Sequence, residues 1–355
     1  MAKNMPRVAI IGTTIWGLTL GVVLGRKGLQ VRLWARTERE AKQLTKSRTS
    51  PTLRVTFPEQ LSITSSLPEA LNDVKAVILA VPSQTMRQNI KLVAGHLDGK
   101  MLVVSAAKGL EIGSNKRMSE VITEEIAPRF QSNICVLSGP NLAREVLTGL
   151  PAAAVVAAEK ESLARVGQRL LSTPNLCIYT NTDVVGVELG GALKNIIALG
   201  AGMADGLGYG DNAKAAFITR GLTEITALGV ALGANPLTFS GLAGLGDLVA
   251  TCASPLSRNH YVGVELTKGC PLTEIVDSME GIAEGVSTTI AVRTIAQQMG
   301  LEMPITEKIY QVLYEDAEPR QVTQGLMGGN ARHELSGKKW GLFSLFRRRK
   351  IRQKG

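Results

Sequence analysis

The chain has 355 residues, a length that suits two domains better than a single core. Hydrophobic residues make up 45% and charged residues 20%, as in a globular protein, while aromatics at 4% argue against a stacking surface for single-stranded nucleic acid. The net charge of +10 includes eight Lys or Arg, with no acid, between residues 338 and 355, so the rest carries only +2 and we expect no nucleic-acid partner.

The first half of the chain alternates short apolar runs with helical patterns. We expect strands at residues 7–12, 30–35, 76–81, 101–105 and 134–137. Helical patterns lie between them, at 16–27, 83–94 and 119–127. Unbroken apolar strands that alternate with helices are typical of an α/β fold with a doubly wound, Rossmann-like parallel sheet.

The second half is rich in Ala, Gly and Leu at helical spacing. Helices are expected at 184–205, 212–232, 284–300 and 307–314. We therefore predict a dinucleotide-binding domain over 1–185, an all-helical substrate domain over 186–335 and a disordered basic tail over 336–355.

The spacing of the cysteines and the hydropathy of the chain indicate the cellular compartment in which the protein works. The four cysteines are widely spaced, without a C-x-x-C pair or metal-ligand spacing, so we expect reduced thiols and no metal site. The N-terminus has no secretory pattern, and no apolar run suggests a membrane span. A cytoplasmic protein is the expectation.

The first expected strand leads into a glycine-containing turn, Gly12-Thr-Thr-Ile-Trp-Gly17. The dinucleotide-binding pattern is G-x-G-x-x-G, in which the middle glycine lets the backbone approach a pyrophosphate. Thr14 stands at that middle position. The helix start can still bind an anion through its free N–H groups. A tight turn without a ligand is the alternative.

Arg36 stands at the end of the second expected strand, where NAD-selective sites carry an acid. An arginine can pair with a 2′-phosphate or stack on adenine, which favours NADPH over NADH. The alternative is a solvated surface arginine.

Lys194 is the one cation in a long apolar helical pattern, and Gly190 and Gly191 lie on the turn before it. Ketone reduction by hydride needs a proton donor, and a buried lysine can supply one. The two glycines suggest that something comes close there, either a substrate or a neighbouring helix.

Further polar residues follow glycine-rich or strand-end positions. Asp247 ends the run G-L-A-G-L-G-D and can accept hydrogen bonds from a substrate hydroxyl, orient a lysine or cap a helix. Ser257-Arg258-Asn259 supplies donors for a phosphate, or a capped helix with a solvated arginine. Lys108 and Ser138-Gly139-Pro140 follow two expected strands and should line one crevice.

Together these segments resemble the bacterial NAD(P)-dependent glycerol-3-phosphate dehydrogenase family, from about residue 7 to 335. The segments that carry the resemblance are AVPSQTMR (80–87), AAKGLE (106–111), LSGPNLAREV (137–146), 183–221 around GGALKN, TFSGLAGLGDLVATCASPLSRN (238–259), EGVST (284–288) and EMPITEKIYQVLYE (302–315).

The resemblance implies reduction of dihydroxyacetone phosphate to sn-glycerol 3-phosphate, for phospholipid synthesis, by a cytoplasmic enzyme that often forms dimers. It implies that Lys194 is the general acid and base. Substrate-binding positions would be Lys108, Gly139, Asn141, Lys194, Asp247, Ser257, Arg258 and Asn259. Cofactor-binding positions would be Gly12, Ile15, Trp16, Gly17, Arg36, Lys108, Ala143, Arg258, Ile282 and Glu284.

The chain departs from the family pattern at Thr14, Ile15 and Asn141, and it lacks the family's N-P motif near Thr49–Leu53. Thr14 replaces the middle glycine and Ile15 a small polar residue, so a non-catalytic or weakly active dinucleotide-binding homologue is one alternative. Asn141 replaces a serine. A reductase for another small keto or imino compound is a second alternative.

The last residues combine an aromatic and aliphatic stretch, 340–346, with the basic cluster 347–350. Such a segment can bind an anionic lipid surface weakly. A solvated tail is the alternative.

Overall fold

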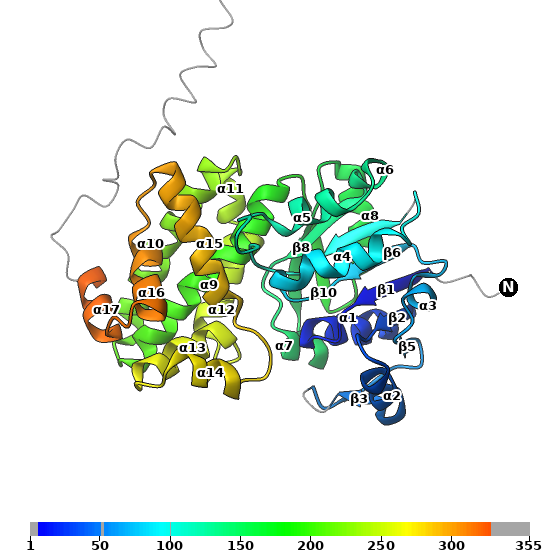
Figure 1. The fold of residues 1–355 in the computed structure, drawn as a ribbon, viewed down its shortest axis with the longest axis horizontal. Coiled ribbons are helices and arrows are strands. Elements are labelled where there is room, and N and C mark those ends of the chain that lie inside the picture. The colour runs from blue at the N-terminus through cyan, green and yellow to red at the C-terminus, as the bar shows by residue number, and fades with distance from the viewer. Residues whose placement is uncertain (1–5, 51–52, 100, 328–355) are drawn as a thin grey trace, which may run out of the picture.

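A computed structural model describes residues 6–50, 53–99 and 101–327, which form two lobes. Figure 1 shows one lobe around a β-sheet and the other built from helices. The predicted tail over 336–355 lies outside the described residues.

Eight strands form one sheet in the order β10-β9-β8-β7-β6-β1-β2-β5. Their bounds are β1 Arg7–Ile11, β2 Gln30–Trp34, β5 Leu61–Thr64, β6 Ala76–Leu79, β7 Leu102–Ser105, β8 Ile134–Ser138, β9 Ala152–Ala157 and β10 Leu176–Asn181. A separate hairpin pairs β3 Thr49–Ser50 with β4 Val55–Thr56. Strand order reverses at β1, which pairs in parallel with both β2 and β6. Such a reversal opens a ligand crevice at the carboxyl ends of the strands.

One edge of the sheet departs from the predicted parallel arrangement. β9 pairs with β8 in antiparallel orientation, and β10 then pairs with β9 in parallel. The only helix between β8 and β9 is the short α7, Ala143–Thr148, which leaves little chain for the crossover that a parallel pair requires. The doubly wound α/β fold is confirmed, and this edge is its exception.

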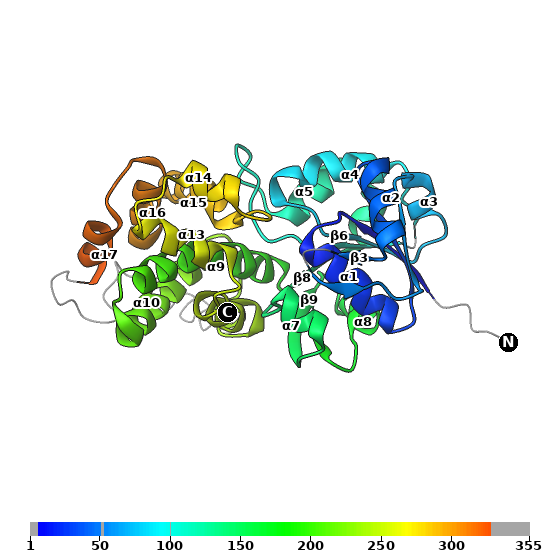
Figure 2. The same cartoon turned by 90° about the horizontal axis from the view of Figure 1, so that it is seen from below.

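Helices cover both faces of the sheet (Figure 2). α1, α7 and α8 contribute to the apolar core on one face, and α3 to α6 to the core on the other. The bounds are α1 Ile15–Arg26, α2 Glu38–Ser47, α3 Leu67–Leu71, η1 Ser83–Thr85, α4 Met86–Ala94, α5 Met118–Glu125, α6 Pro128–Gln131 and α8 Glu161–Leu171.

From Val184 to Met327 the described chain is helical, around the central α9, Val184–Gly206. The other bounds are α10 Gly210–Ala231, α11 Pro236–Phe239, η2 Leu242–Gly246, α12 Asp247–Ala253, α13 Arg258–Thr267, α14 Leu272–Ser278, α15 Glu284–Met299, α16 Pro304–Tyr314 and α17 Pro319–Met327. Helix α9 is buried along most of its length because neighbouring helices surround it.

Two segments are long and apolar enough to cross a membrane by length and composition, α9 and residues 236–253. The most apolar window of α9 is 83% buried inside the protein, as expected of a core helix. Residues 236–253 are divided among α11, η2 and α12. We therefore describe both as parts of the helical domain.

Candidate functional site

The turn between β1 and α1 depends on both predicted glycines. Gly12 has φ +107°, a conformation that L side chains rarely adopt, and its N–H donates to the Trp34 carbonyl at 3.3 Å. A Cβ on Gly17 would lie 2.2 Å from the Gly12 carbonyl oxygen. These contacts bring the start of α1 against the ends of β1 and β2, as a dinucleotide turn requires.

Thr14 occupies the middle position without backbone strain. Its φ is −59°, and its Oγ1 accepts from Gly17 N–H at 3.1 Å and donates to the Ala80 carbonyl at 2.7 Å. The side chain thus caps α1 and contacts the end of β6. The N–H groups of Ile15 and Trp16 stay available at the helix start for a pyrophosphate. This turn fits the pyrophosphate of a dinucleotide.

Three further predicted cofactor positions lie on other elements. Arg36 follows β2, is exposed, and places Nη2 3.5 Å from Oε1 of Gln88 on α4. Ala143 is the first residue of α7. Ile282, 46% exposed, lies in the loop before α15.

Two lysines from different domains meet at one carboxylate. Lys108 Nζ donates to Asp247 Oδ2 at 2.7 Å, and Lys194 Nζ donates to Asp247 Oδ1. Asp247 is only 2% exposed, at the start of α12. Lys194 Nζ also donates to Thr251 Oγ1 at 2.6 Å. Asp247 therefore orients a lysine, as one predicted role has it, and Gly246 rather than Asp247 is the N-cap of α12.

The Lys108 ammonium is held in a largely buried position. Burial lowers its pKa to about 8, the nearby Lys194 adds to that effect, and Asp247 opposes it. Lys108 Nζ also donates to the Gly139 carbonyl and to Asn141 Oδ1, both at 3.0 Å. The structure thus brings Lys108, Lys194, Asp247, Gly139 and Asn141 together.

The Asn141 amide has a spare donor. A lysine ammonium can only donate, so the contact with Lys108 fixes the carbonyl end of the amide toward Nζ. The opposite atom, Nδ2, is buried and has no partner among the described residues. A buried donor without a partner is costly, so Nδ2 is well suited to a ligand oxygen.

Gly190 and Gly191 make room for protein rather than for a substrate. A Cβ on Gly190 would lie 2.4 Å from the Ala243 carbonyl oxygen in η2. One on Gly191 would lie 2.3 Å from Ser138 Oγ. Close packing, which the sequence left as one explanation, therefore accounts for both glycines.

Within the set Ser257-Arg258-Asn259, two side chains make hydrogen bonds inside the protein and the third is exposed. Ser257 caps α13 by accepting from His260 N–H. Asn259 donates to Asn195 Oδ1 and accepts from Gly285 N–H, both at 2.9 Å. Arg258 is exposed. Of the three, Arg258 is best placed to bind a phosphate.

Glu284 joins the two domains. Its Oε1 accepts from Ser83 N–H at 2.9 Å, and Ser83 Oγ donates to the same carboxylate. Burial raises the Glu284 pKa, and the contacts with Ser83 oppose that shift. A Cβ on Gly109, the residue that follows Lys108, would contact both Ser83 Oγ and the Glu284 carboxylate. Glu284 therefore lies close to the backbone beside Lys108.

Sequence reasoning missed Ser83, Asn195 and Thr251 as members of this network. Thr251 lies four residues after Asp247 on α12, a spacing that puts both on one helix face and offered a usable signal. Asn195 follows Lys194 directly. Ser83 contacts Glu284, 201 residues away, and nothing local predicts that pair.

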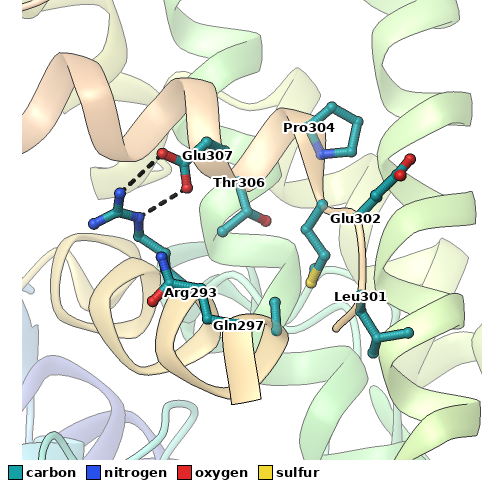
Figure 3. Close-up of a pocket in the computed structure, with 9 residues that line it drawn as sticks. Arg293, Gln297, Leu301, Glu302, Pro304, Thr306 and Glu307 are labelled. Carbon is teal, nitrogen blue, oxygen red and sulfur yellow. Dashed lines mark hydrogen bonds and ion pairs between the residues drawn. The ribbon is translucent and has the colours of Figure 1, made fainter. Parts of the chain in front are cut away.

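A separate hollow of about 360 Å³ lies between α15 and α16 (Figure 3). Arg293 spans it to Glu307 through hydrogen bonds of 2.8 and 3.0 Å and packs over the Tyr310 ring. The charges of Arg293 and Glu307 therefore neutralise each other. None of the predicted site residues lines this hollow, so we place the candidate site where the two domains meet, at the contact of Lys108 with Asp247.

The Rossmann-like domain has a first turn that suits a pyrophosphate, and its Lys108 meets Lys194 of the helical domain at the buried Asp247 carboxylate. This combination defines the class, a dinucleotide-dependent oxidoreductase. Two family models match, described as NAD-dependent glycerol-3-phosphate dehydrogenase N-terminus (residues 7–164) and C-terminus (residues 183–324). The chain belongs to the NAD-dependent glycerol-3-phosphate dehydrogenase family.

Relatives match along nearly the whole length. A glycerol-3-phosphate dehydrogenase [NAD(P)+] of Dehalococcoides mccartyi is 60% identical over 352 residues, 98% of each chain. One from Streptomyces coelicolor is 48% identical over 92% of this chain and 98% of its own. The crystal structure of glycerol-3-phosphate dehydrogenase from Coxiella burnetii, 35% identical, superposes with a TM-score of 0.85 over 92% of this chain and 99% of that one. The predicted family and its NAD(P)-dependent enzyme class are confirmed, and the alternative of an inactive homologue finds no support.

Proposed function

We propose that this chain reduces dihydroxyacetone phosphate to sn-glycerol 3-phosphate with NADPH or NADH, and that Lys194 is the proton donor. The observation that carries the proposal is the buried Lys194 ammonium, held by Asp247 and Thr251 and joined through Asp247 to Lys108. The nicotinamide, when bound, supplies the hydride for C2 of the substrate. Lys194 donates a proton to the C2 oxygen in reduction and accepts one in the reverse reaction.

Other residues of the crevice bind the substrate in this proposal. Arg258 and Lys108 provide positive charge for the phosphate. Asn141 Nδ2 donates to a substrate oxygen, and the backbone at Gly139 lies beside it. Asp247 orients both lysines, while Ser257 and Asn259 support Arg258 by fixing the start of α13.

The cofactor lies across the carboxyl edge of the sheet in this proposal. The turn Gly12–Gly17, with the N–H groups of Ile15 and Trp16, binds the pyrophosphate. The remaining contacts come from Arg36, Lys108, Ala143, Arg258, Ile282 and Glu284. We also propose the domain limits 1–185 and 186–335.

The test is a steady-state assay of dihydroxyacetone phosphate reduction with each reduced cofactor. Lys194→Ala should abolish turnover and leave NADPH binding, measured by fluorescence titration, nearly intact. Lys268→Ala, a surface lysine of the same domain that pairs with Glu265, is the matched control and should stay fully active. Near-normal turnover in the Lys194 variant would refute the assignment.

We propose that the product serves phospholipid synthesis, that the enzyme works in the cytoplasm and that it forms a homodimer. Family membership supports these statements. Light scattering during size-exclusion chromatography tests the dimer, for which we expect twice the chain mass of 37.8 kDa. A mass of one chain at micromolar concentration would contradict it.

We propose weak membrane contact through residues 340–350. The basic cluster beside an apolar stretch supports binding to an anionic surface. Flotation with anionic liposomes should recover more of the full chain than of a chain that ends at Leu335. Equal recovery would remove the idea.

A further inference from the structure

Glu40 extends from α2 to the dinucleotide turn. It lies in the first turn of α2, whose N-cap Thr37 accepts a hydrogen bond from Glu40 N–H at 3.2 Å. Thr13, between Gly12 and Thr14, donates from Oγ1 to Glu40 Oε1 at 2.5 Å. A carboxylate therefore lies beside the turn, though it comes from another element.

This position matches the place where Rossmann-like domains bind the adenosine ribose. The turn lies against the end of β2 through the contact between Gly12 N–H and the Trp34 carbonyl. The ribose of a bound dinucleotide lies between that turn and that strand end, where NAD-selective proteins use an acid at the strand end itself. Here Arg36 stands at the strand end, and the structure brings in an acid from four residues further along.

The charge on Glu40 is not neutralised by a nearby cation. Glu38, two residues earlier on α2, pairs with Lys42 at 2.7 Å, whereas the contact of the Glu40 carboxylate among the described residues is with the Thr13 hydroxyl and not with a cation. Arg36 extends instead toward Gln88 on α4. One Glu40 oxygen accepts from Thr13, and a carboxylate has acceptor capacity for further hydrogen bonds.

We propose that Glu40 accepts hydrogen bonds from the adenosine ribose hydroxyls and is a specificity-determining residue that favours NADH over NADPH. This inference rests on the dinucleotide site of the proposed function. A 2′-phosphate at the same position would face an unpaired negative charge, which repels it. Arg36 attracts that phosphate, so the two residues oppose each other in setting the cofactor ratio.

The experiment measures the dissociation constants of NADH and NADPH by fluorescence titration, without turnover. Glu40→Gln keeps the shape of the side chain and removes its charge. We expect NADPH to bind about 5-fold more tightly and NADH about 2-fold more weakly, a shift of about 10-fold in the ratio of the two constants. Glu38→Gln on the same helix turn is the matched control and should leave the ratio within about 2-fold.

Two further variants separate recognition from a structural role. Thr13→Val removes the hydroxyl that holds Glu40 and should shift the ratio in the same direction by a smaller factor. Glu40→Asp retains the charge and should stay closer to the wild-type ratio than Glu40→Gln does. If Glu40 only held α2 against the turn, Glu40→Gln would change both constants by the same factor.

The outcomes distinguish a failure of the Glu40 role from a failure of the dinucleotide site itself. Wild-type chain that binds both cofactors, with a ratio unmoved in Glu40→Gln, refutes the role of Glu40 alone. Wild-type chain that binds neither cofactor refutes the dinucleotide site and this inference together. A shift toward NADPH in Glu40→Gln, absent in Glu38→Gln, supports the inference.

Discussion

The buried amine of Lys108 should give substrate capture an alkaline limit. Its pKa is about 8, so the amine is protonated and positive below that pH and neutral above it. Because the substrate carries a phosphate dianion, capture needs the protonated form. About nine in ten Lys108 amines are protonated at pH 7 and about one in ten at pH 9, so kcat/KM for dihydroxyacetone phosphate should fall about 10-fold between them.

The assay follows kcat/KM between pH 6.5 and 10 at saturating cofactor, with kcat determined separately. Lys108→Arg keeps a positive charge that does not titrate in this range. Its kcat/KM should be lower than that of the wild type at pH 7 and should stay constant up to about pH 10. The alkaline fall in the wild type should appear mainly in KM, because Lys108 binds substrate in this scheme. A wild-type profile that stays level to pH 9.5, or the same fall in Lys108→Arg, would contradict a substrate-binding role for the Lys108 ammonium.

Two further changes test packing and binding in the same crevice. Asn141→Ala removes the spare Nδ2 donor and should raise KM for dihydroxyacetone phosphate about 10-fold while the dissociation constant of NADPH changes little; an unchanged KM would contradict a substrate contact. Gly190→Ala places a Cβ 2.4 Å from the Ala243 carbonyl oxygen and should lower the free energy of unfolding in urea by about 2 kcal/mol. Gly95→Ala, where nothing lies within 4 Å of the added Cβ, is its control, and equal unfolding midpoints for the two variants would overturn the packing argument.

The central strands could be predicted because their apolar runs are unbroken. β1 and β6 are buried on both faces, and a local pattern is enough to recognise such strands. Of the strands in this sheet, β5, β9 and β10 were missed. β10 alternates buried and exposed residues at the end of the sheet, and the reversal between β8 and β9 depends on which strand they pair with. Pairing partners are a property of the whole fold, so the local pattern could not predict them, although β9 itself is an unbroken apolar run that could have indicated a strand.

The residues of the lysine site could be predicted from the sequence, but the hydrogen bonds that join them across the two domains could not. An ammonium in an apolar helix must find a carboxylate, so Lys194 and Asp247 could be expected to interact. That Asp247 also holds Lys108 follows only from the approach of the two domains. Asn141 shows the same limit, because its free Nδ2 becomes evident once Lys108 fixes the other end of the amide.

The two domains are held together by carboxylates of the helical domain that accept hydrogen bonds from donors of the sheet domain. Asp247 accepts from Lys108 and Glu284 from Ser83. Glu188 on α9 accepts from Ser119 N–H, at the start of α5, at 2.7 Å. Each carboxylate is buried, and a buried carboxylate that loses its donors is strongly destabilising. These three contacts therefore hold the two domains together, and a variant that removes one of the donors should weaken the packing between them.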